Sequence, residues 1–435
     1  MHNAELLVQS AKKTAPTTTP KLLAVEFEVF GHHAEFVQNI ADVWLGSELD
    51  GCLEFLLTNR FKTVHASVVD HIRGMNDPRI SLSFITESEE TLLKSPSLKH
   101  WNGWKLFCDY ATRTNANLGL LMYFDRFQLP IWLGKTSPIP FSGIYFRPTF
   151  HYHTFKGLRR TVVDRAVAWR KQFLLQRVLR NKKLAKLFSL DPVAVPYIQE
   201  HFQAEGRISH FADSFPRIPP SEIQVQKLRK ELAIGPNRLV FCLIGVLDNR
   251  KGPMQLLESI RHLPPTVADK ICILLAGRAP EIYRSKLESK VAQIQATTPV
   301  QLILRNEYIA TSDVQSYFAL ADVMLTTYQY HKGSSSVLLR SASQHKPLLS
   351  SDYGLLGHLV RTYGLGITID SSRPTAIAAG IVRMATSNPK SFLNVSNADR
   401  LARENSQEQL ALGLSRLLEH ATTRSACSLN QSREN

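Results

Sequence analysis

The sequence has few cysteines and no long apolar run. Its five cysteines are spread over 435 residues and never form a C-x-x-C pair. This spacing predicts neither a disulfide framework nor a zinc site, and it favours a cytoplasmic protein. No apolar stretch reaches the roughly 20 residues that a membrane-spanning helix needs. Residues 1–20 lack the apolar core of a signal peptide, so we expect a short flexible lead there.

Acidic residues are also in short supply. The chain has 37 Asp and Glu against 52 Lys and Arg, which gives a formal net charge of +15. The excess is concentrated in residues 156–188, where eleven basic residues accompany a single acid, Asp164. Such a segment attracts anionic lipid headgroups, polyanions or acidic substrates. It predicts either a peripheral contact with the anionic inner face of a membrane or an ordinary solvated helix with a basic exterior.

The arrangement of residues in the basic segment limits the kinds of partner that it fits. Arg170 and Arg177 fall on the same helical face as Val163 and Val167, which makes a poor amphipathic anchor. No recognised nucleic-acid-binding motif accompanies the charge. We therefore expect no nucleic-acid partner.

Both halves of the chain alternate apolar, strand-like runs with helical patterns. This alternation predicts an α/β protein with parallel sheets flanked by helices. Tandem prolines at 219–220 favour an extended connector, where we place the domain boundary. The expected organisation is a lead over 1–20, a first domain over 21–218, a second domain over 219–396, a helix over 397–420 and a tail over 421–435. The strand-like runs are 22–30, 52–58, 80–86, 118–124 and 142–146 in the first half, and 238–247, 271–277, 300–306, 322–327, 347–351 and 367–369 in the second.

Two Gly-containing loops in the second half follow apolar runs and open helices. In the first loop, Gly245 ends a strand, and Arg250 and Lys251 precede a helix. Free N–H groups at a helix start and a nearby ammonium suit a diphosphate. In the second loop, Gly333 and three serines precede the helix expected over 337–344. Small residues there let a phosphate approach the backbone, although a serine before a helix is also an ordinary N-cap.

The order of motifs across the second half resembles one known family. The series runs strand–G-x-L-x-x-x-K-G, strand–A-G, N-E-Y-I, L-A-D-V, K-G-x-S-x-V-L-L-R-x-A-x-x-x-K-P-L-x-S-S-D and G-L-G-I. Over residues 239–369 it is similar to the donor half of GT-B-fold glycosyltransferases. The similarity is closest to the group 1, retaining branch, which uses nucleotide sugars. The first half fits more loosely, through its first strand and the turn F-G-H-H-A-E-F-V-Q-N-I-A-D-V-W at 30–44.

The resemblance implies a fold, a reaction and a co-substrate. It implies two Rossmann-like domains whose parallel sheets face each other across a cleft, with the helix over 397–420 crossing back to the first domain. It implies hexosyl transfer with retention from a UDP- or GDP-sugar, as in polysaccharide biosynthesis, without a further cofactor. The acceptor is not identified; a lipid-linked or polysaccharide precursor is our expectation.

The resemblance also assigns roles within the second half. Lys251 would contact the donor phosphates, and the backbone around Gly333 would line the diphosphate and the sugar. The donor-site residues implied in this way are Gly245, Arg250, Lys251, Lys332, Gly333, Ser334, Ser335, Ser336 and Arg340, with Tyr308 and Ile309 near the nucleobase.

Three positions depart from the family pattern. The family has Glu-x7-Glu where this chain has Lys332 and Arg340, and an arginine cannot accept hydrogen bonds from ribose hydroxyls. The usual loop arginine is Val246, and His358 stands near the place of another acid. We expect Lys332 and Arg340 to take over charge neutralisation at the phosphates or to bind an acidic sugar. The alternative is a decayed site in a catalytically inactive, GT-B-like protein that binds or scaffolds.

Polar residues also follow two strands of the first half. His32 and Asp125 are the candidate catalytic residues, because either side chain would orient an acceptor hydroxyl or accept its proton. Gly31, His33 and Arg126 are expected on the acceptor side of the cleft. The alternative for each of them is an ordinary loop residue.

The sequence carries no metal signature. It has no Asp-x-Asp motif, and the near-paired His151 and His153 lack acidic or cysteine partners at metal-site spacing. The favoured function is a glycosyltransferase that moves a sugar from a nucleotide-diphosphate-sugar to an unidentified acceptor. The inactive scaffold is the alternative from another class. A nucleotide-dependent sugar epimerase shares the two-lobed architecture but fits the ordered motifs less well.

Overall fold

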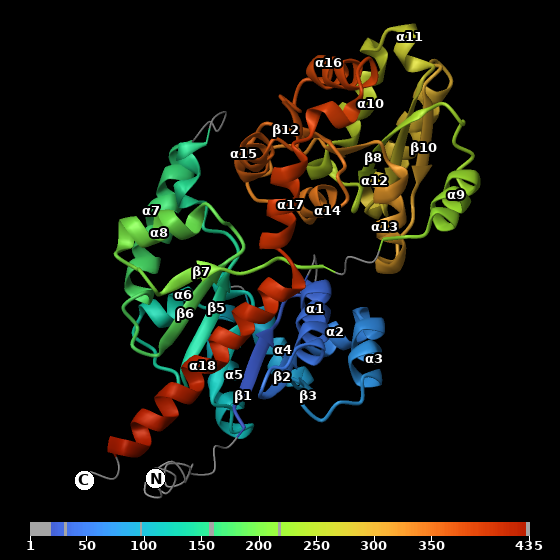
Figure 1. The fold of residues 1–435 in the computed structure, drawn as a ribbon. Coiled ribbons are helices and arrows are strands. Elements are labelled where there is room, and N and C mark those ends of the chain that lie inside the picture. The colour runs from blue at the N-terminus through green and yellow to red at the C-terminus, as the bar shows by residue number, and fades with distance from the viewer. Residues whose placement is uncertain (1–18, 30–32, 96–97, 156–160, 216–218, 432–435) are drawn as a thin grey trace, which may run out of the picture.

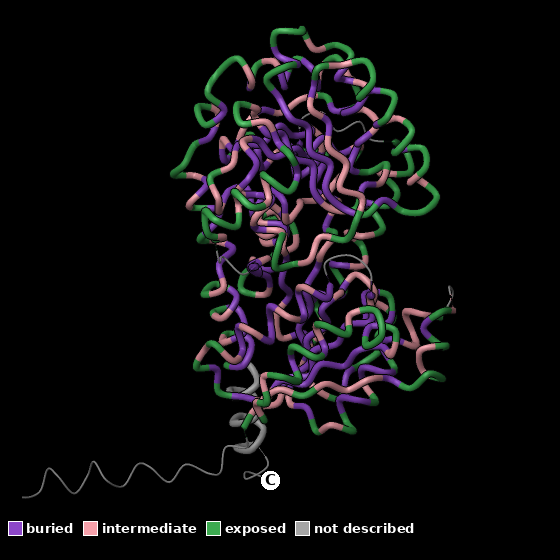
Figure 2. The backbone as a smooth tube through the Cα atoms, turned by 90° about the vertical axis from the view of Figure 1, so that its right-hand side faces the viewer, coloured by how far each residue is buried: buried purple, intermediate pink, exposed green. Residues whose placement is uncertain are grey.

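The structure is a computed structural model that describes residues 19–29, 33–95, 98–155, 161–215 and 219–431. It has two lobes, each built on a parallel sheet with helices on both faces (Figure 1). Buried residues gather inside each lobe, and the outer loops and helices are exposed (Figure 2). This arrangement confirms the predicted α/β fold with two Rossmann-like domains. No helix in the described ranges is long and apolar enough to cross a membrane.

The N-terminal domain contains a seven-stranded sheet in the order β3-β2-β1-β4-β5-β6-β7. Its inner strands are buried and mostly apolar because helices cover both faces of a parallel sheet. The strands are β1 Lys21–Glu26, β2 Cys52–Leu57, β3 Ile80–Phe84, β4 Leu118–Leu121, β5 Phe141–Tyr145, β6 Leu184–Ser189 and β7 Ile208–His210. The helices are α1 His33–Gly46, α2 Asn59–Val64, α3 Ala66–Gly74, α4 Glu87–Lys94, α5 Lys99–Arg113, η1 Phe124–Arg126, α6 Gln128–Trp132, η2 Thr149–Thr154, α7 Val162–Val178 and α8 Ala194–Phe202.

The C-terminal domain contains a six-stranded sheet in the order β10-β9-β8-β11-β12-β13. The strands are β8 Leu239–Ile244, β9 Ile271–Ala276, β10 Gln301–Arg305, β11 Val323–Thr326, β12 Leu348–Ser351 and β13 Gly366–Ile369. The helices are α9 Glu222–Glu231, η3 Asn249–Lys251, α10 Pro253–Ser259, η4 Ile260–His262, α11 Pro265–Ala268, α12 Glu281–Gln295, α13 Thr311–Leu320, α14 Ser336–Ser343, α15 Gly354–Tyr363, α16 Pro374–Ala385, η5 Pro389–Phe392, α17 Val395–Glu404 and α18 Gln407–Gln431.

The segment expected as one helix over 397–420 consists of two helices, α17 and α18. The chain breaks at Asn405, whose side chain donates to the carbonyl of Leu401 and accepts from the backbone N–H of Asp213. After the break, α18 crosses the N-terminal domain (Figure 1), where Leu410 and Leu414 are fully buried in the core beside α1. The last helix therefore packs against the first domain, and it continues to Gln431.

Two strands of the N-terminal sheet are not predicted by the sequence pattern. β6 interrupts its apolar residues with Lys186, and β7 is only three residues long. Both lie at one edge of the sheet, where burial on two faces is no longer required. The periodic signal is correspondingly weak at this edge.

Candidate functional site

The strand orders place the candidate loops at two topological switch points. In the C-terminal sheet the order reverses between β8 and β11, and in the N-terminal sheet it reverses between β1 and β4. In open parallel sheets, ligands bind at the carboxyl ends of the strands where the order reverses. The loops after β8 and β11 are the two Gly-containing loops of the sequence. The segments after β1 and β4 carry His33 and Asp125.

Lys251 is a buried cation at the C-terminal switch point. The Asp248 carboxylate accepts from the backbone N–H of Lys251 and so caps η3, which places the lysine beneath the loop. The Lys251 Nζ donates to the carbonyl of Ile244 at 3.0 Å and to the hydroxyl of Tyr328 at 2.5 Å. Within the described ranges no carboxylate forms an ion pair with it, although the residue is 6% exposed. A buried charge without a counter-ion is costly, so this position favours an anionic ligand.

Tyr328 joins the two loops. An ammonium only donates, so the Tyr328 oxygen accepts from Lys251, and the Tyr328 hydroxyl also forms a hydrogen bond with the Ser335 hydroxyl, with 3.2 Å between the two oxygens. The Ser335 hydroxyl also accepts from the backbone N–H of Val337 and caps α14. The sequence analysis did not select Tyr328. Its place just after a buried strand, in T-T-Y-Q-Y, is the signal that marks it.

His331 lies near several positively charged side chains. Its Nε2 donates to the carbonyl of Ser334 at 2.8 Å, which ties down the loop before α14. Burial lowers the pKa of the His331 imidazole. The positive charges of Arg250, Lys251 and Arg147 lower that pKa further. The imidazole is therefore kept neutral among cations, an environment that attracts a polyanion such as a diphosphate.

Arg147 belongs to the N-terminal domain, yet it acts on both sides of the cleft. Its charge lowers the pKa of His331 in the C-terminal domain and opposes protonation of His33 in the N-terminal domain. Arg147 follows β5 and is exposed. The sequence analysis did not select it, although a basic residue directly after the strand S-G-I-Y-F is a recognisable signal. Its charge therefore lies near both His331 and His33.

Lys332 and Arg340 both form ion pairs with the N-terminal domain. Lys332 binds Asp164 in the first turn of α7, and Arg340 binds Glu35 in the first turn of α1. Arg340 is 5% exposed, and its guanidinium lies over the ring of Phe215 at 4.5 Å. It leans toward the start of its helix, as the i, i+4 spacing predicts, because it lines the same small cavity as Ser336. In this arrangement, carboxylates of the other domain neutralise both cations.

Lys332 also changes the acid that it binds. Its hydrogen bond and the capping interactions of Thr161 lower the pKa of Asp164 to about 2. Asp164 therefore stays ionised over the whole physiological range and keeps its negative charge at the start of α7.

The acceptor-side candidates have mostly local partners. His33 Nδ1 pairs with the buried carboxylate of Glu26 at 2.7 Å. Asp125 accepts from the backbone N–H of Phe146 at 2.9 Å, and burial raises the pKa of its carboxyl group. Arg126 forms an ion pair with Glu28 at 2.5 Å. The structure thus gathers His33, Asp125 and Arg126 at one end of the sheet, and their catalytic or acceptor roles stay predictions.

Of the four other candidates, two are not described by the structure and two belong to the C-terminal domain. Gly31 and His32 are outside the described residues. Tyr308 is 75% exposed in the loop after β10, the edge strand of the C-terminal sheet. Its proposed place near the nucleobase, together with that of Ile309, stays a prediction. In the described part of the chain no group of three or more His, Cys, Asp or Glu side chains is arranged to hold a metal ion.

The fold and the switch-point loops define a two-domain protein of the GT-B class. Residues 224–401 match the family model described as glycosyl transferases group 1, the family that the ordered motifs of this region resemble. Two curated relatives match over shorter segments. The Methanocaldococcus jannaschii protein named uncharacterized glycosyltransferase MJ1069 is 25% identical over 174 residues, 39% of this chain and 42% of the relative. The Bacillus subtilis protein YtcC, whose name assigns it provisionally to the glycosyltransferases, is 24% identical over 162 residues, 36% of this chain and 39% of the relative. The matches therefore span about two fifths of these relatives.

Solved structures share the fold over nearly the whole chain. HepE of Anabaena, in complex with UDP and glucose, has a TM-score of 0.64 at 16% identity and covers 92% of this chain and 99% of its own. Sucrose-phosphate synthase of Thermosynechococcus elongatus has a TM-score of 0.66 at 13% identity and covers 93% of this chain and 100% of its own. WaaG, a glycosyltransferase involved in lipopolysaccharide biosynthesis, has a TM-score of 0.59 at 13% identity and covers 91% of this chain and 98% of its own. At these identities the likeness shows the GT-B fold.

Proposed function

We propose that this protein is a glycosyltransferase that moves a hexose from a nucleotide-diphosphate-sugar, a UDP- or GDP-sugar, to an acceptor hydroxyl. The observation that carries the proposal is Lys251, a buried ammonium with no ion-pair partner in the described ranges, beneath the loops after β8 and β11. The group 1 family match of residues 224–401 supports it. HepE, which shares the fold, was solved with UDP, and this agrees with a uridine nucleotide as donor.

The chemistry that these residues supply is stabilisation of a leaving diphosphate. Lys251 and Arg250 would neutralise its charge from below, and backbone N–H groups of the loop that leads into α14 would bind its oxygens. Arg147 would approach from the N-terminal domain when the cleft closes on the donor. These donors are already in place when negative charge develops on the leaving diphosphate. They would stabilise that charge in the transition state and so lower the barrier to transfer.

The acceptor would enter from the side of the N-terminal switch point. His33 and Asp125 lie there at the carboxyl ends of β1 and β4 and would orient the acceptor hydroxyl. We propose a lipid-linked or polysaccharide precursor as the acceptor, a retaining outcome as the family resemblance implies, and a place at the inner face of a membrane. With a retaining outcome, no dedicated protein base is required, because a phosphate oxygen of the donor would accept the proton of the acceptor hydroxyl.

A second candidate function, an inactive binding or scaffold protein, is favoured by one specific observation. Lys332 and Arg340, the cations at the two divergent motif positions, are both neutralised by Asp164 and Glu35. These ion pairs join the domains beside the donor loops. If they hold the cleft shut, no nucleotide-sugar enters.

Calorimetric titration with UDP, GDP and ADP distinguishes the two functions. We expect one of the nucleotides to bind the wild-type chain and the Lys251→Met variant to bind it at least about tenfold more weakly, since the methionine keeps the apolar stem and removes the charge. Lys346→Met is the matched control, because Lys346 also donates its ammonium to a carbonyl, that of Ala319, in the same domain. Absence of nucleotide binding at high micromolar concentration would leave the scaffold function standing.

A further inference from the structure

Helix α7 has apolar residues on two opposite faces. Its inner face is buried against the domain through Ala168, Leu175 and Val178. Positions 162, 166, 169, 173, 177 and 180 recur every three or four residues and form one stripe on the opposite side. This stripe is apolar over the first three turns and ends in two arginines. The sequence analysis considered the flank around Val163 and Val167, and it did not consider this outer stripe.

The outer stripe is unusually exposed for its composition. Val162 is 81% exposed, Trp169 is 65% exposed and Phe173 is 46% exposed. The rings of Trp169 and Phe173 are stacked, with 5.5 Å between their centroids. The centroid of the Phe173 ring also lies 5.4 Å from that of Trp132, at the end of α6. Leu133, next to Trp132, is 49% exposed. Contiguous exposed apolar groups of this kind mark an interaction surface.

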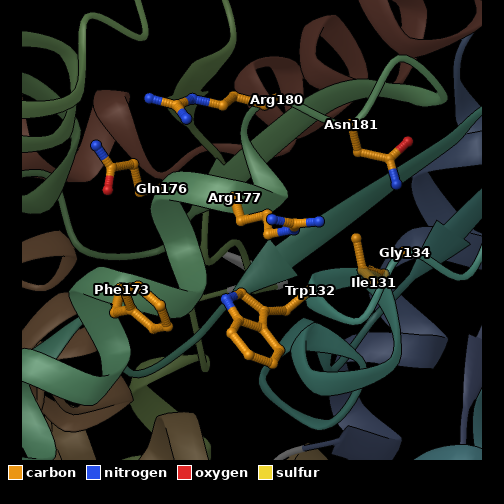
Figure 3. Close-up of a pocket in the computed structure, with 8 residues that line it drawn as sticks. All are labelled: Ile131, Trp132, Gly134, Phe173, Gln176, Arg177, Arg180 and Asn181. Carbon is orange, nitrogen blue, oxygen red and sulfur yellow. The ribbon is translucent and has the colours of Figure 1, made fainter.

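A pocket of about 370 Å³ opens at the basic end of this stripe (Figure 3). Trp132 and Phe173 form its apolar part, and Arg177 and Arg180 reach it from the last turn of α7 and just beyond (Figure 3). The indole N–H of Trp132 is buried and has no acceptor among the described residues. A buried donor is normally satisfied, so this N–H is an unsatisfied polar group beside the pocket.

The charges around the pocket are uncompensated. Among the described residues, Arg177 and Arg180 form no ion pair with a carboxylate. The one acid of α7, Asp164, is bound to Lys332 at the other end of the helix. A partner that fits must therefore offer anionic oxygens beside an apolar layer. The surface of an anionic phospholipid bilayer offers both, because tryptophan and phenylalanine enter the headgroup boundary while arginines bind the phosphates. A soluble polyanion offers no apolar layer for Trp169 and Phe173.

We propose that this α6–α7 surface, formed by Trp132, Leu133, Trp169, Phe173, Arg177 and Arg180, docks on an anionic phospholipid bilayer. Arg177 and Arg180 bind headgroup phosphates at the pocket, beside the indole ring of Trp132. Trp169 and Phe173 enter the acyl boundary. The proposal rests on the proposed function for one consequence only: α7 begins at the Lys332–Asp164 contact beside the donor loops, so docking brings a lipid-linked acceptor next to the cleft.

Vesicle flotation of the full-length chain tests the docking. We expect the wild-type protein to float with phosphatidylcholine vesicles that contain phosphatidylglycerol and to remain unbound with phosphatidylcholine alone. The pair Arg177→Glu and Arg180→Glu is expected to weaken binding at least about tenfold, since each basic residue contributes measurably near an anionic surface. The pair Trp169→Ser and Phe173→Ser is expected to weaken binding while leaving its dependence on anionic lipid.

The C-terminal domain offers matched controls. Lys227 and Lys230 are exposed on α9 with the same spacing of three residues, and Ile223 is 80% exposed on the same helix. Lys227→Glu with Lys230→Glu, and separately Ile223→Ser, should float like the wild type. Equal flotation of the arginine pair and its control, binding independent of lipid charge, or tighter binding to a DNA oligonucleotide than to the vesicles overturns the proposal. Nucleotide calorimetry on the same variants should be unchanged, which keeps failure of docking distinct from failure of the transferase function.

Discussion

Arg340 and Glu35 form an ion pair that joins the two domains, although 305 residues separate them in the chain. The arginine comes from α14, which follows the loop after β11, and the glutamate comes from the first turn of α1. Phe215, at the end of the N-terminal domain, supplies an aromatic face for the guanidinium. The arginine is thus built into the domain interface, and its charge is part of how the lobes fit together.

The two partners of this pair should differ in what their removal costs. The side chain of Arg340 is 6% exposed and that of Glu35 is 29% exposed. Glu35→Ala leaves a buried, unpaired guanidinium and should lower the free energy of unfolding by about 3 kcal/mol. Arg340→Met leaves a glutamate that water can reach, so a smaller loss of about 1 kcal/mol is expected. Urea denaturation of the two variants measures the difference, with Glu48→Ala, an exposed acid of the same region, as the control. Equal losses, or a larger loss for Arg340→Met, would contradict the assignment of the pair as buried on the arginine side.

The Lys332–Asp164 pair should be visible as a change in one pKa. The pKa of Asp164 is lowered to about 2, first by its hydrogen bond with Lys332 and then by Thr161. A carboxyl group whose folded pKa is lowered contributes stability above its ordinary value of 3.8, and that contribution is lost as the pH falls toward 2. Lys332→Met should therefore move the pKa of Asp164 back toward 3.8, although capping by Thr161 keeps part of the shift. Carbon NMR titration of the carboxyl groups gives the value.

Asp77 is the internal control for that titration. Its pKa is lowered by Arg79 in the same loop, far from Lys332 in the chain, and should not move in the variant. An unchanged Asp164 in Lys332→Met would mean that the interdomain pair does not form in solution.

Much of the C-terminal domain could be predicted from the sequence because its signals are local. The central strands β8 and β9 are continuous apolar runs, and the loops that follow β8 and β11 carry their glycines and serines within a few residues. The position of Lys251 next to a helix start was therefore predictable. Its bond to Tyr328, 77 residues further on, was not, because no periodic pattern links the two.

The partners of Lys332 and Arg340 lay beyond sequence reasoning for the same reason. From the sequence we expected the two cations to neutralise the donor phosphates or to bind an acidic sugar, and no pattern pointed to Asp164 and Glu35 as their partners. Which acid reaches them depends on how one lobe is placed on the other, and α18, which packs back on the first domain, contributes to that placement. The sequence pattern did not reveal the outer stripe of α7 for a different reason. A helix with apolar residues on two faces has no single apolar side, so its periodic pattern is ambiguous.

The pH dependence of His33 should reverse when its partner is removed. Burial lowers the pKa of the His33 imidazole, but the ion pair with Glu26 outweighs burial and leaves the pKa raised above 6.5. A raised histidine pKa contributes stability that is fully present below 6.5 and is lost as the pH rises through the folded value. In Glu26→Gln, burial dominates, so the pKa should fall below 6.5 and stability at acidic pH should decrease.

Proton NMR of the histidine ring signals gives both values. His331 in the other domain, whose pKa is already lowered by burial, should titrate unchanged in Glu26→Gln. An unchanged His33 pKa in the variant would show that Glu26 does not stabilise the protonated imidazole.

Alanine substitutions at Gly252 and Gly206 distinguish two contributions to the free energy of unfolding: backbone strain, and a steric clash between the loops after β8 and β11. It adopts φ +74°, and a Cβ there would lie 2.4 Å from the carbonyl oxygen of Thr327. Gly206 has nearly the same conformation, φ +72°, but a Cβ there would meet nothing within 4 Å. Gly206→Ala should therefore cost only the strain of a left-handed residue, about 1 kcal/mol, whereas Gly252→Ala should cost about 1–3 kcal/mol more. Because the clash pushes the loop after β8 away from the loop after β11, Gly252→Ala should also weaken nucleotide binding, and Gly206→Ala should not. Thermal unfolding and calorimetry measure the two effects, and equal behaviour of the variants would mean that the loops do not meet in solution as they do in this structure.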